Sequence, residues 1–253
     1  MPDLRLIAAD VLKLRRRRGM LSLTLLGTLG IVALVFTVTT IQHATNPGKY
    51  GPAGGLDTYR DAITVVGLLA LVAGVIVGGT AGTQDIESGV FRDLAATGRS
   101  RTALFLSRAI GALAVVLPIL LVTAFAAAAG SIALKGDLPA PDADTLIAGT
   151  ALVLAAGALS TAVAVGMSAV VGSRGPVIGI LLAFFVGISP LLEAIGFLGD
   201  SRQLIPEVAI NRIGDVSAAP GMHVALGGAI AVVLGWIAVS LAAGAWRTKT
   251  REI

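Results

Sequence analysis

The side chains that could carry out catalysis are few and do not form a recognisable constellation. The chain has no cysteine and only two histidines, His43 and His223. Ser168 lies in the run Gly-Met-Ser-Ala-Val, which lacks the second glycine of a nucleophile elbow. There is no His-Glu-x-x-His metal motif and no Gly-x-x-x-x-Gly-Lys-Ser/Thr phosphate loop. The sequence therefore argues against an enzyme and against ATP hydrolysis through such a loop.

One segment, 84–103, combines acidic, apolar and basic side chains at close spacing. Asp85 and Glu87 precede a short helical pattern, and carboxylates stabilise the positive end of a helix. Phe91 and Leu94 are three residues apart, so they share one face of that helix. We expect this helix to lie on the membrane surface, where it can dock in a groove of a soluble partner.

The rest of the chain has the composition of an integral membrane protein. Of 253 residues, 55% are hydrophobic and 13% are charged, whereas soluble domains have about 25% charged residues. About 20 apolar residues in a helix cross the hydrocarbon core. Six stretches qualify, and we expect no charged side chain in the central part of any of them. They are 20–41, 62–83, 104–134, 145–172, 176–198 and 222–246.

The distribution of charge predicts the orientation of these spans. With the N-terminus inside, 14 of the 19 basic residues and 6 of the 15 acidic residues fall on the inner side. The inner side then carries +8 and the outer side −4. Lys and Arg gather in cytoplasmic loops, so both termini are expected in the cytoplasm. The same bias explains the basic composition without nucleic acid as a partner.

The N-terminal segment, 1–18, reads as an amphipathic helix at the cytoplasmic interface. Its apolar residues recur at three- and four-residue spacing, while Asp3, Arg5 and Asp10 are expected elsewhere on the helical wheel. The apolar positions are Leu4, Ile7, Ala8, Val11 and Leu12, and the basic run that should contact anionic lipid is Arg15, Arg16, Arg17 and Arg18.

Two further segments are expected on the outer side. The segment 46–61 is rich in Gly and Pro and predicts an irregular turn. In 199–221, apolar residues alternate with charged ones, which predicts short helices on or in the outer face.

Small residues indicate where helices can approach closely. Gly74, Gly78 and Gly82 recur every four residues, as do Gly175 and Gly179. Such rows let two backbones come into contact within a membrane.

The segment 84–103 resembles the intracellular signature of ABC-2-type exporter permeases. That signature has Glu-x-Gly, then Leu, Pro, Ser-Arg and Lys at set distances. The matching positions are Glu87, Gly89, Leu94, Gly98, Ser100, Arg101 and Arg108. Gly98 replaces the proline and Arg108 replaces the lysine. From its place near the start of a span, Arg108 is expected to extend toward the interface.

The resemblance implies an all-α membrane fold in which residues 1–253 form a single permease domain. It implies six spans, an N-terminal elbow helix and short external helices before the last span. The segment 84–103 would be the coupling helix that contacts a separate ATPase subunit, which carries ATP and Mg²⁺. The residues expected there are Asp85, Glu87, Gly89, Phe91, Arg92, Leu94, Ser100 and Arg101.

The expected setting is a bacterial cell membrane, in which two permease chains, identical or different, pair with two ATPases. Two alternatives remain open from the sequence. One is a stand-alone carrier driven by sodium or by diffusion, and the other is a membrane enzyme or scaffold. The substrate is not encoded in any motif.

Overall fold

The computed structural model describes residues 4–90, 98, 100–216 and 224–250, and these residues contain helices and no strand. Six of the described helices are long and apolar enough to cross a bilayer. The expected all-α membrane class is therefore confirmed. The spans are Arg18–Thr45, Leu56–Glu87, Arg101–Ala133, Ala143–Val171, Arg174–Ala194 and Leu226–Thr250.

Four of the spans are single helices, and the other two are interrupted by a π-helical turn. The single ones are α4 (Leu56–Glu87), α6 (Arg101–Ala133), α7 (Ala143–Val171) and α11 (Leu226–Thr250). The first span consists of α2 (Arg18–Leu25), η1 (Leu26–Gly30) and α3 (Ile31–Thr45). The fifth consists of α8 (Arg174–Leu182), η2 (Ala183–Ile188) and α9 (Ser189–Ala194).

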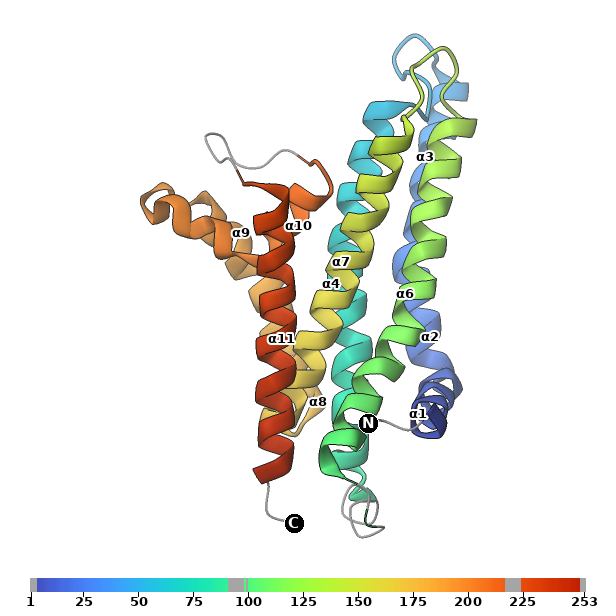
Figure 1. Ribbon diagram of the computed structural model, residues 1–253. Coiled ribbons are helices and arrows are strands. Elements are labelled where there is room, and N and C mark those ends of the chain that lie inside the picture. The colour runs from blue at the N-terminus through green and yellow to red at the C-terminus, as the bar shows by residue number, and fades with distance from the viewer. Residues whose placement is uncertain (1–3, 91–97, 99, 217–223, 251–253) are drawn as a thin grey trace.

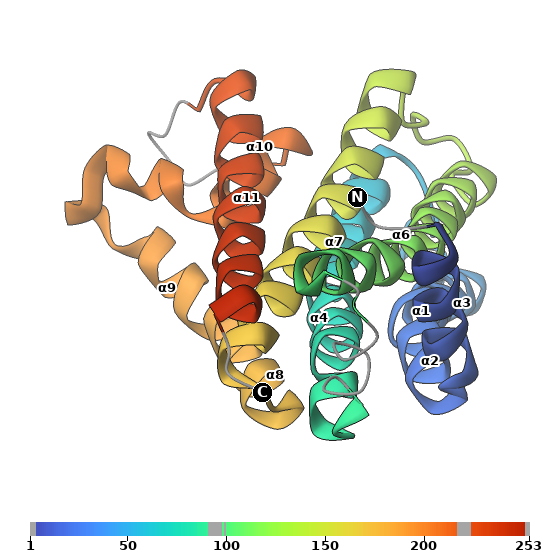
Figure 2. The same ribbon diagram turned by 60° about the horizontal axis from the view of Figure 1, so that its bottom comes forward.

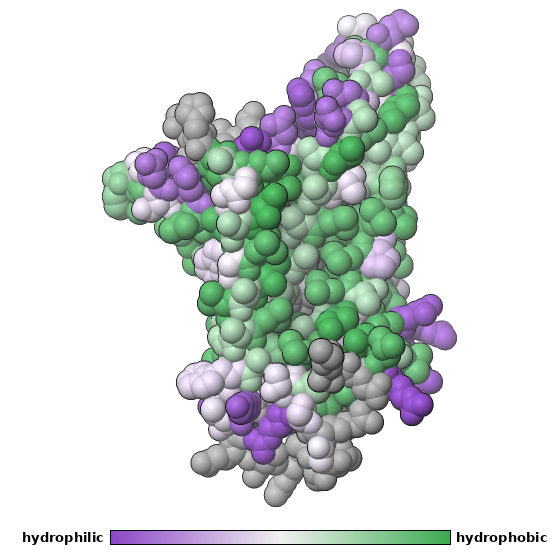
Figure 3. Space-filling model, viewed as in Figure 1, coloured by the Kyte–Doolittle hydropathy of each residue, from purple (hydrophilic) through white to green (hydrophobic). Residues whose placement is uncertain are grey.

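The helices α4 and α7 form the centre of the bundle (Figures 1 and 2). The first span packs beside α6 and α4, while α8 and α11 cover the other side of α7. Space filling shows apolar surface in a broad band between two polar ends (Figure 3). Because α6 has 33 residues, it is about 50 Å long and extends beyond the hydrocarbon core at one or both ends.

The close contact between α4 and α7 depends on the glycine row of α4. A Cβ atom at Gly78 would lie 2.5 Å from the carbonyl oxygen of Thr161. One at Gly82 would lie 2.6 Å from Oγ of Ser168, so neither position has room for a side chain. Gly74 meets α7 in the same way, against the carbonyl oxygen of residue 157.

The second glycine row has no such contact. A Cβ atom at Gly175 or Gly179 would have no atom within 4 Å. Within the part of the chain that the structure describes, this row therefore makes no helix–helix contact. Both glycines lie in α8, on a surface that the bundle leaves open.

The two ends of the bundle differ in charge and structure. The helix α1 (Leu4–Arg16) and the last turn of α11 lie at one end, called here the basic end (Figure 1). At the opposite end, called here the hairpin end, α9 leads into the 3₁₀ helix η3 (Gly196–Leu204) and the short helix α10 (Pro206–Ile213). Nε1 of Trp236 on α11 donates a 3.0 Å hydrogen bond to the carbonyl of Leu204, which joins this hairpin to the last span.

Two expected boundaries change. The helix α4 begins at Leu56, so the irregular part of 46–61 is shorter than expected. At its other end α4 continues to Glu87, and α6 begins at Arg101. Asp85 and Glu87 therefore close a spanning helix instead of opening a surface helix. Phe91, Arg92 and Leu94 lie outside the described residues, so the surface helix itself stays a prediction.

Candidate functional site

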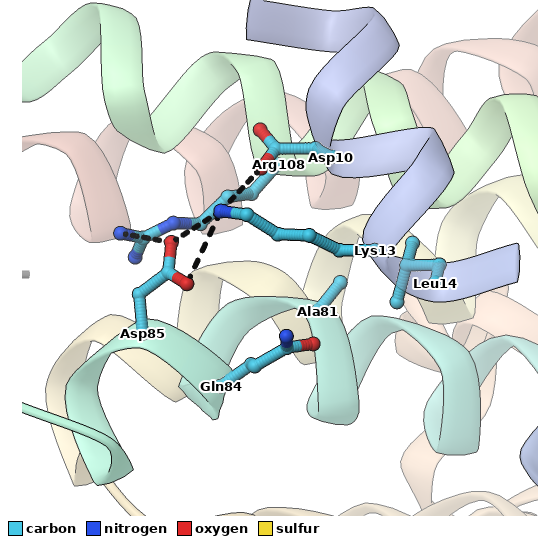
Figure 4. A pocket seen from close by; sticks show the side chains of 7 residues that line it. All are labelled: Asp10, Lys13, Leu14, Ala81, Gln84, Asp85 and Arg108. Atoms are coloured by element: carbon cyan, nitrogen blue, oxygen red, sulfur yellow. Dashed lines mark hydrogen bonds and ion pairs between the residues drawn. The ribbon is translucent and has the colours of Figure 1, made fainter. Parts of the chain in front are cut away.

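Four charged side chains meet at the basic end and form what is called here the ionic cluster (Figure 4). Asp10 and Lys13 come from α1, Asp85 from the last turn of α4, and Arg108 from the second turn of α6. Nζ of Lys13 lies 3.2 Å from Oδ1 of Asp10 and 3.3 Å from Oδ1 of Asp85. Nη2 of Arg108 lies 3.1 Å from Oδ2 of Asp85. Three helices that are distant in sequence are thus joined by charge.

The ionic cluster is electrically balanced and mostly buried. Two carboxylates face two cations, and the exposed fractions of Asp10, Asp85 and Arg108 are 8%, 6% and 4%. Removing one partner of a buried ion pair leaves an uncompensated charge, which costs about 3–5 kcal/mol. The cavity beside these residues is only about 10 Å³, which is room for about one water molecule. The cluster is therefore a structural link and not a ligand site.

Asp10, expected away from the apolar positions of α1, is buried against the bundle. Asp10 and Leu14 are the two buried residues of this helix, while Leu4 and Leu12 are exposed. Oγ of Ser107 donates a 2.7 Å hydrogen bond to Oδ2 of Asp10. The face that carries Asp10 thus packs on α6, while Leu4 and Leu12 point away from the bundle.

The position of Arg108 is also different from the expectation. Its side chain is 5% exposed, so it turns into the bundle and does not extend to the interface. Asp85 holds it there, which occupies the carboxylate that was expected to contact an ATPase. The Asp85 carboxylate is thus paired within the bundle, and its contact with an ATPase stays a prediction.

Glu87 makes a second link, between α4 and the fifth span. Its Oε1 accepts a 2.6 Å hydrogen bond from the backbone N–H of Arg174, the first residue of α8. Ser173 occupies the N-cap position of α8 but makes no side-chain cap bond. Glu87 thus supplies the missing acceptor from another helix and places a negative charge at a positive helix end.

The polypeptide between these links and α6 is exposed wherever it is described. Gly89 and Gly98 both have positive φ, at 74° and 78°. Proline fixes φ near −65°, so the proline of the family signature could not adopt the conformation seen at Gly98. Both glycines make turns that redirect the chain between α4 and α6.

The end of the segment is attached to α6 and α11. Oγ of Ser100 accepts a 3.2 Å hydrogen bond from the N–H of Ala103 and so caps α6. Nη1 of Arg101 donates to the carbonyl oxygen of Lys249 in the last turn of α11, at 3.4 Å. The two residues expected to contact a partner therefore also have defined contacts within the chain.

Comparison with protein families decides the class of this arrangement. The model of the ABC-2 family transporter proteins matches residues 6–190, which is most of the chain. The chain belongs to the ABC-2 transporter family. No curated protein matches it. The expected resemblance is thus confirmed, and the matched region of the permease contains the whole ionic cluster together with Glu87 and Arg174.

The four arginines expected at the membrane interface lie at the junction of α1 and α2. Arg15, Arg16 and Arg18 are exposed and Arg17 is partly buried. Arg17 stands between the two helices, with φ −81° and ψ 71°, so the chain turns there from α1 into the first span.

Sequence reasoning did not find Asp10, Lys13 or Arg174 as site residues of the permease. A signal for Asp10 was present, because it falls in the helical row formed by Ile7, Val11 and Leu14. A carboxylate in such a row indicates a buried partner. For Arg174 there was no signal, because its backbone and not its side chain makes the contact.

Proposed function

We propose that this chain is the membrane subunit of an ATP-driven ABC-2 exporter and that a separate ATPase subunit drives it from the basic end. Membership of the ABC-2 family supports the transport function. The absence of a phosphate loop from the sequence supports a second polypeptide as the source of energy. ATP and Mg²⁺ would bind to that ATPase.

The observation that carries the proposal is the pair of links at the end of α4. Asp85 joins α4 to α6 and α1, and two residues later Glu87 joins α4 to α8. The segment 88–100 begins directly after these links and is exposed at every described position. A force applied to that segment therefore reaches four helices at once, including the two that flank it in sequence.

The mechanism follows from this geometry. Closure of an ATPase dimer would push the segment 88–100, and the ionic cluster would make α1, α4 and α6 move as one unit. Packing interfaces have discrete arrangements, so such a movement can switch a bundle between two states. A second permease chain, identical or different, would provide the other wall of the transport path. The basic end would face the cytoplasm of a bacterium, in agreement with its +8 charge.

The test is co-expression with the ATPase encoded by a neighbouring reading frame. Residues 88–97 are replaced by a Gly-Ser sequence of equal length, and the control replaces the loop 135–141 at the hairpin end in the same way. We expect the first variant to lose co-purification with the ATPase, and the control to retain it. Thermal unfolding of each purified chain shows whether the bundle is intact.

A complex that forms normally without the native 88–97 sequence, and whose ATPase still responds to transported compounds, would overturn the proposal. So would ATP-independent transport by the purified chain alone in liposomes, because that result would favour the stand-alone carrier.

A further inference from the structure

A cleft at the hairpin end contains acidic groups that none of the links at the basic end involves. It has a volume of about 230 Å³ and lies between α4, α7, α9 and α10. Its wall on the side of α4 and α7 is apolar except for Thr64, and the hairpin side carries all the other polar side chains of the lining. It is called here the hairpin cleft, and its lining residues used below are Leu68, Leu71, Leu152, Glu193, Glu207 and Asn211.

Glu207 is the feature that points to a ligand. Its exposed fraction is 9%, and among the described residues its Oε2 atom has no hydrogen-bond partner. Oγ of Ser189, on α9, is buried next to this carboxylate. Buried polar atoms almost always find partners, so a carboxylate oxygen left open at a cleft indicates that something else completes it.

The electrostatic environment makes that partner a cation. Burial raises the pKa of Glu207 to about 7, the neighbouring Ser189 hydroxyl partly offsets this, and the charge of Glu193 adds to it. Neither carboxylate belongs to an ion pair between described residues. The hairpin end as a whole carries five basic and nine acidic residues, a net charge of −4. A cation in the cleft would relieve both the local repulsion and the cost of burying the charge.

The lining selects an organic cation over a metal ion. Ca²⁺ takes about 6–8 oxygen ligands, and no group of three metal-binding side chains exists among the described residues. Leu68, Leu71 and Leu152 instead offer an apolar wall opposite Glu207. A site with one charged anchor and an apolar wall fits a molecule with a charged head and a hydrocarbon body.

We propose that the hairpin cleft binds the ammonium group of an amphipathic amine, with its head at Glu207 and Glu193 and its hydrocarbon part against the leucines of α4 and α7. This inference rests on the proposed function, since it names a substrate class for the exporter. Two sources share this chemistry, a free lipophilic amine and the amino headgroup of a membrane lipid.

The experiment uses the full chain in uncharged maltoside micelles at pH 8. The probe is octylamine that carries a diazirine in its alkyl chain, and the matched neutral probe is the corresponding alcohol. After photolysis, labelled peptides are identified by mass spectrometry. We expect the amine to label the peptides of the cleft, from residues 64–71 and 204–213, and unlabelled octylamine but not octanol to compete.

Substitutions of single carboxylates show which of them binds the ammonium group. Glu207→Gln should lower labelling of the cleft at least about tenfold, because it removes a charge-assisted contact. Glu193→Gln, on the partly exposed neighbour, should lower it less. Asp215→Asn is the matched control, because this exposed carboxylate forms an ion pair with Arg212 outside the cleft, and it should leave labelling unchanged. If Glu207→Gln does not fold, Glu193→Gln still tests the site.

Nanodiscs separate the two sources. Wild-type chain in phosphatidylglycerol alone is compared with chain in phosphatidylglycerol plus phosphatidylethanolamine. Loss of labelling in the second lipid, together with phosphatidylethanolamine retained in native mass spectra, identifies the headgroup as the occupant. Unchanged labelling identifies the free amine.

Equal labelling by amine and alcohol, or labelling that Glu207→Gln leaves intact, would overturn the inference. The ATPase co-purification test is independent of this result, so the substrate class can fail while the exporter assignment stands.

Discussion

Oδ2 of Asp85 on α4 lies 3.1 Å from Nη2 of Arg108 on α6, at the point where the chain leaves the bundle for the segment 88–100. Both side chains are nearly inaccessible to solvent. The two helices that carry the exposed segment are therefore held together by an ion pair at their shared end, so they cannot separate there without exposing or unpairing a charge.

Replacing Asp85 by Asn tests this link. The substitution leaves Arg108 buried beside an uncharged amide, and we expect the free energy of unfolding to fall by about 3–5 kcal/mol. Thermal unfolding in detergent, followed by tryptophan fluorescence, measures the loss. Asp57→Asn is the control, because that side chain lies in the first turn of α4 at the opposite end.

The double variant Asp85→Asn/Arg108→Gln tests whether the two side chains stabilise the chain as an ion pair or independently of each other. We expect it to be less destabilised than the sum of the two single variants, because no lone charge remains. Strict additivity of the three unfolding free energies would contradict the pairing.

Replacing Glu87 by Ala should uncap α8. The N–H of Arg174 then loses a charged acceptor, and we expect a loss of about 1 kcal/mol in stability. The larger effect should be on transport by the complex, because α4 and α8 would no longer move together. Asp137→Ala is the control, because it removes an exposed carboxylate from the loop at the hairpin end, and it should leave both quantities unchanged. An equal effect from Asp137→Ala would rule out a specific role for Glu87.

The two glycine rows should respond oppositely to alanine. At Gly179 there is open space, so Gly179→Ala should be neutral or stabilise the chain by up to about 1 kcal/mol through helix propensity. At Gly78 the added methyl group meets the backbone of α7, and overpacking should cost about 1–3 kcal/mol. Unfolding of both purified variants gives the comparison, and equal melting temperatures would contradict the close contact of α4 with α7.

Glu207 should make the stability of the chain depend on pH. Its pKa is about 7 in the fold, against an ordinary value of 4.5. Between these values the folded chain holds a proton that the unfolded chain has released. Stability is therefore fully present below about pH 4.5 and falls as the pH rises through 7, by up to about 3 kcal/mol.

The measurement is the melting temperature of wild type and of Glu207→Gln from pH 5 to pH 8. Neighbouring charged groups on α9, η3 and α10, namely Glu193, Asp200, Arg202 and Arg212, are present in both chains, so the difference between the curves isolates Glu207. Parallel curves would show that its carboxylate titrates normally.

The spans were predictable because hydropathy is a local property. Each of the six apolar stretches became a helix with boundaries shifted by a few residues, and the largest shift, at Leu56, has a simple cause. The first two turns of α4 contain Asp57, Arg60 and Asp61. A search for uncharged stretches excludes these residues, although a helix that extends beyond the hydrocarbon core accommodates them.

The ionic cluster was not predictable because pairing between distant residues leaves no trace in spacing. Lys13 and Asp85 are 72 positions apart, and each alone looks like an ordinary residue at the end of a helix. Asp85 was expected to face a partner because it lies in the segment that resembles the coupling helix of ABC-2-type permeases. The bundle supplies two cations at that point, and the carboxylate turns inward to meet them.

The burial of Glu207 could not be predicted from the sequence either. Its sequence neighbourhood alternates apolar and charged residues, which indicated short helices but not which charge would be covered. The packing of α10 against α7, α9 and α11 buries it. Burial at such a crossing is a property of the tertiary arrangement.

The attachment of α1 to the bundle would couple the rate of transport to the physical state of the lipid headgroups. Leu4 and Leu12 of α1 are exposed, while Asp10 and Lys13 attach the helix to α4 and α6. In the predicted interfacial position, any tilt of α4 and α6 would move α1 sideways through the lipid headgroups. The viscosity and lateral pressure of the headgroup layer would then oppose each transport cycle. Transport should accordingly slow in stiff, tightly packed membranes even where the ATPase and the substrate are unaffected.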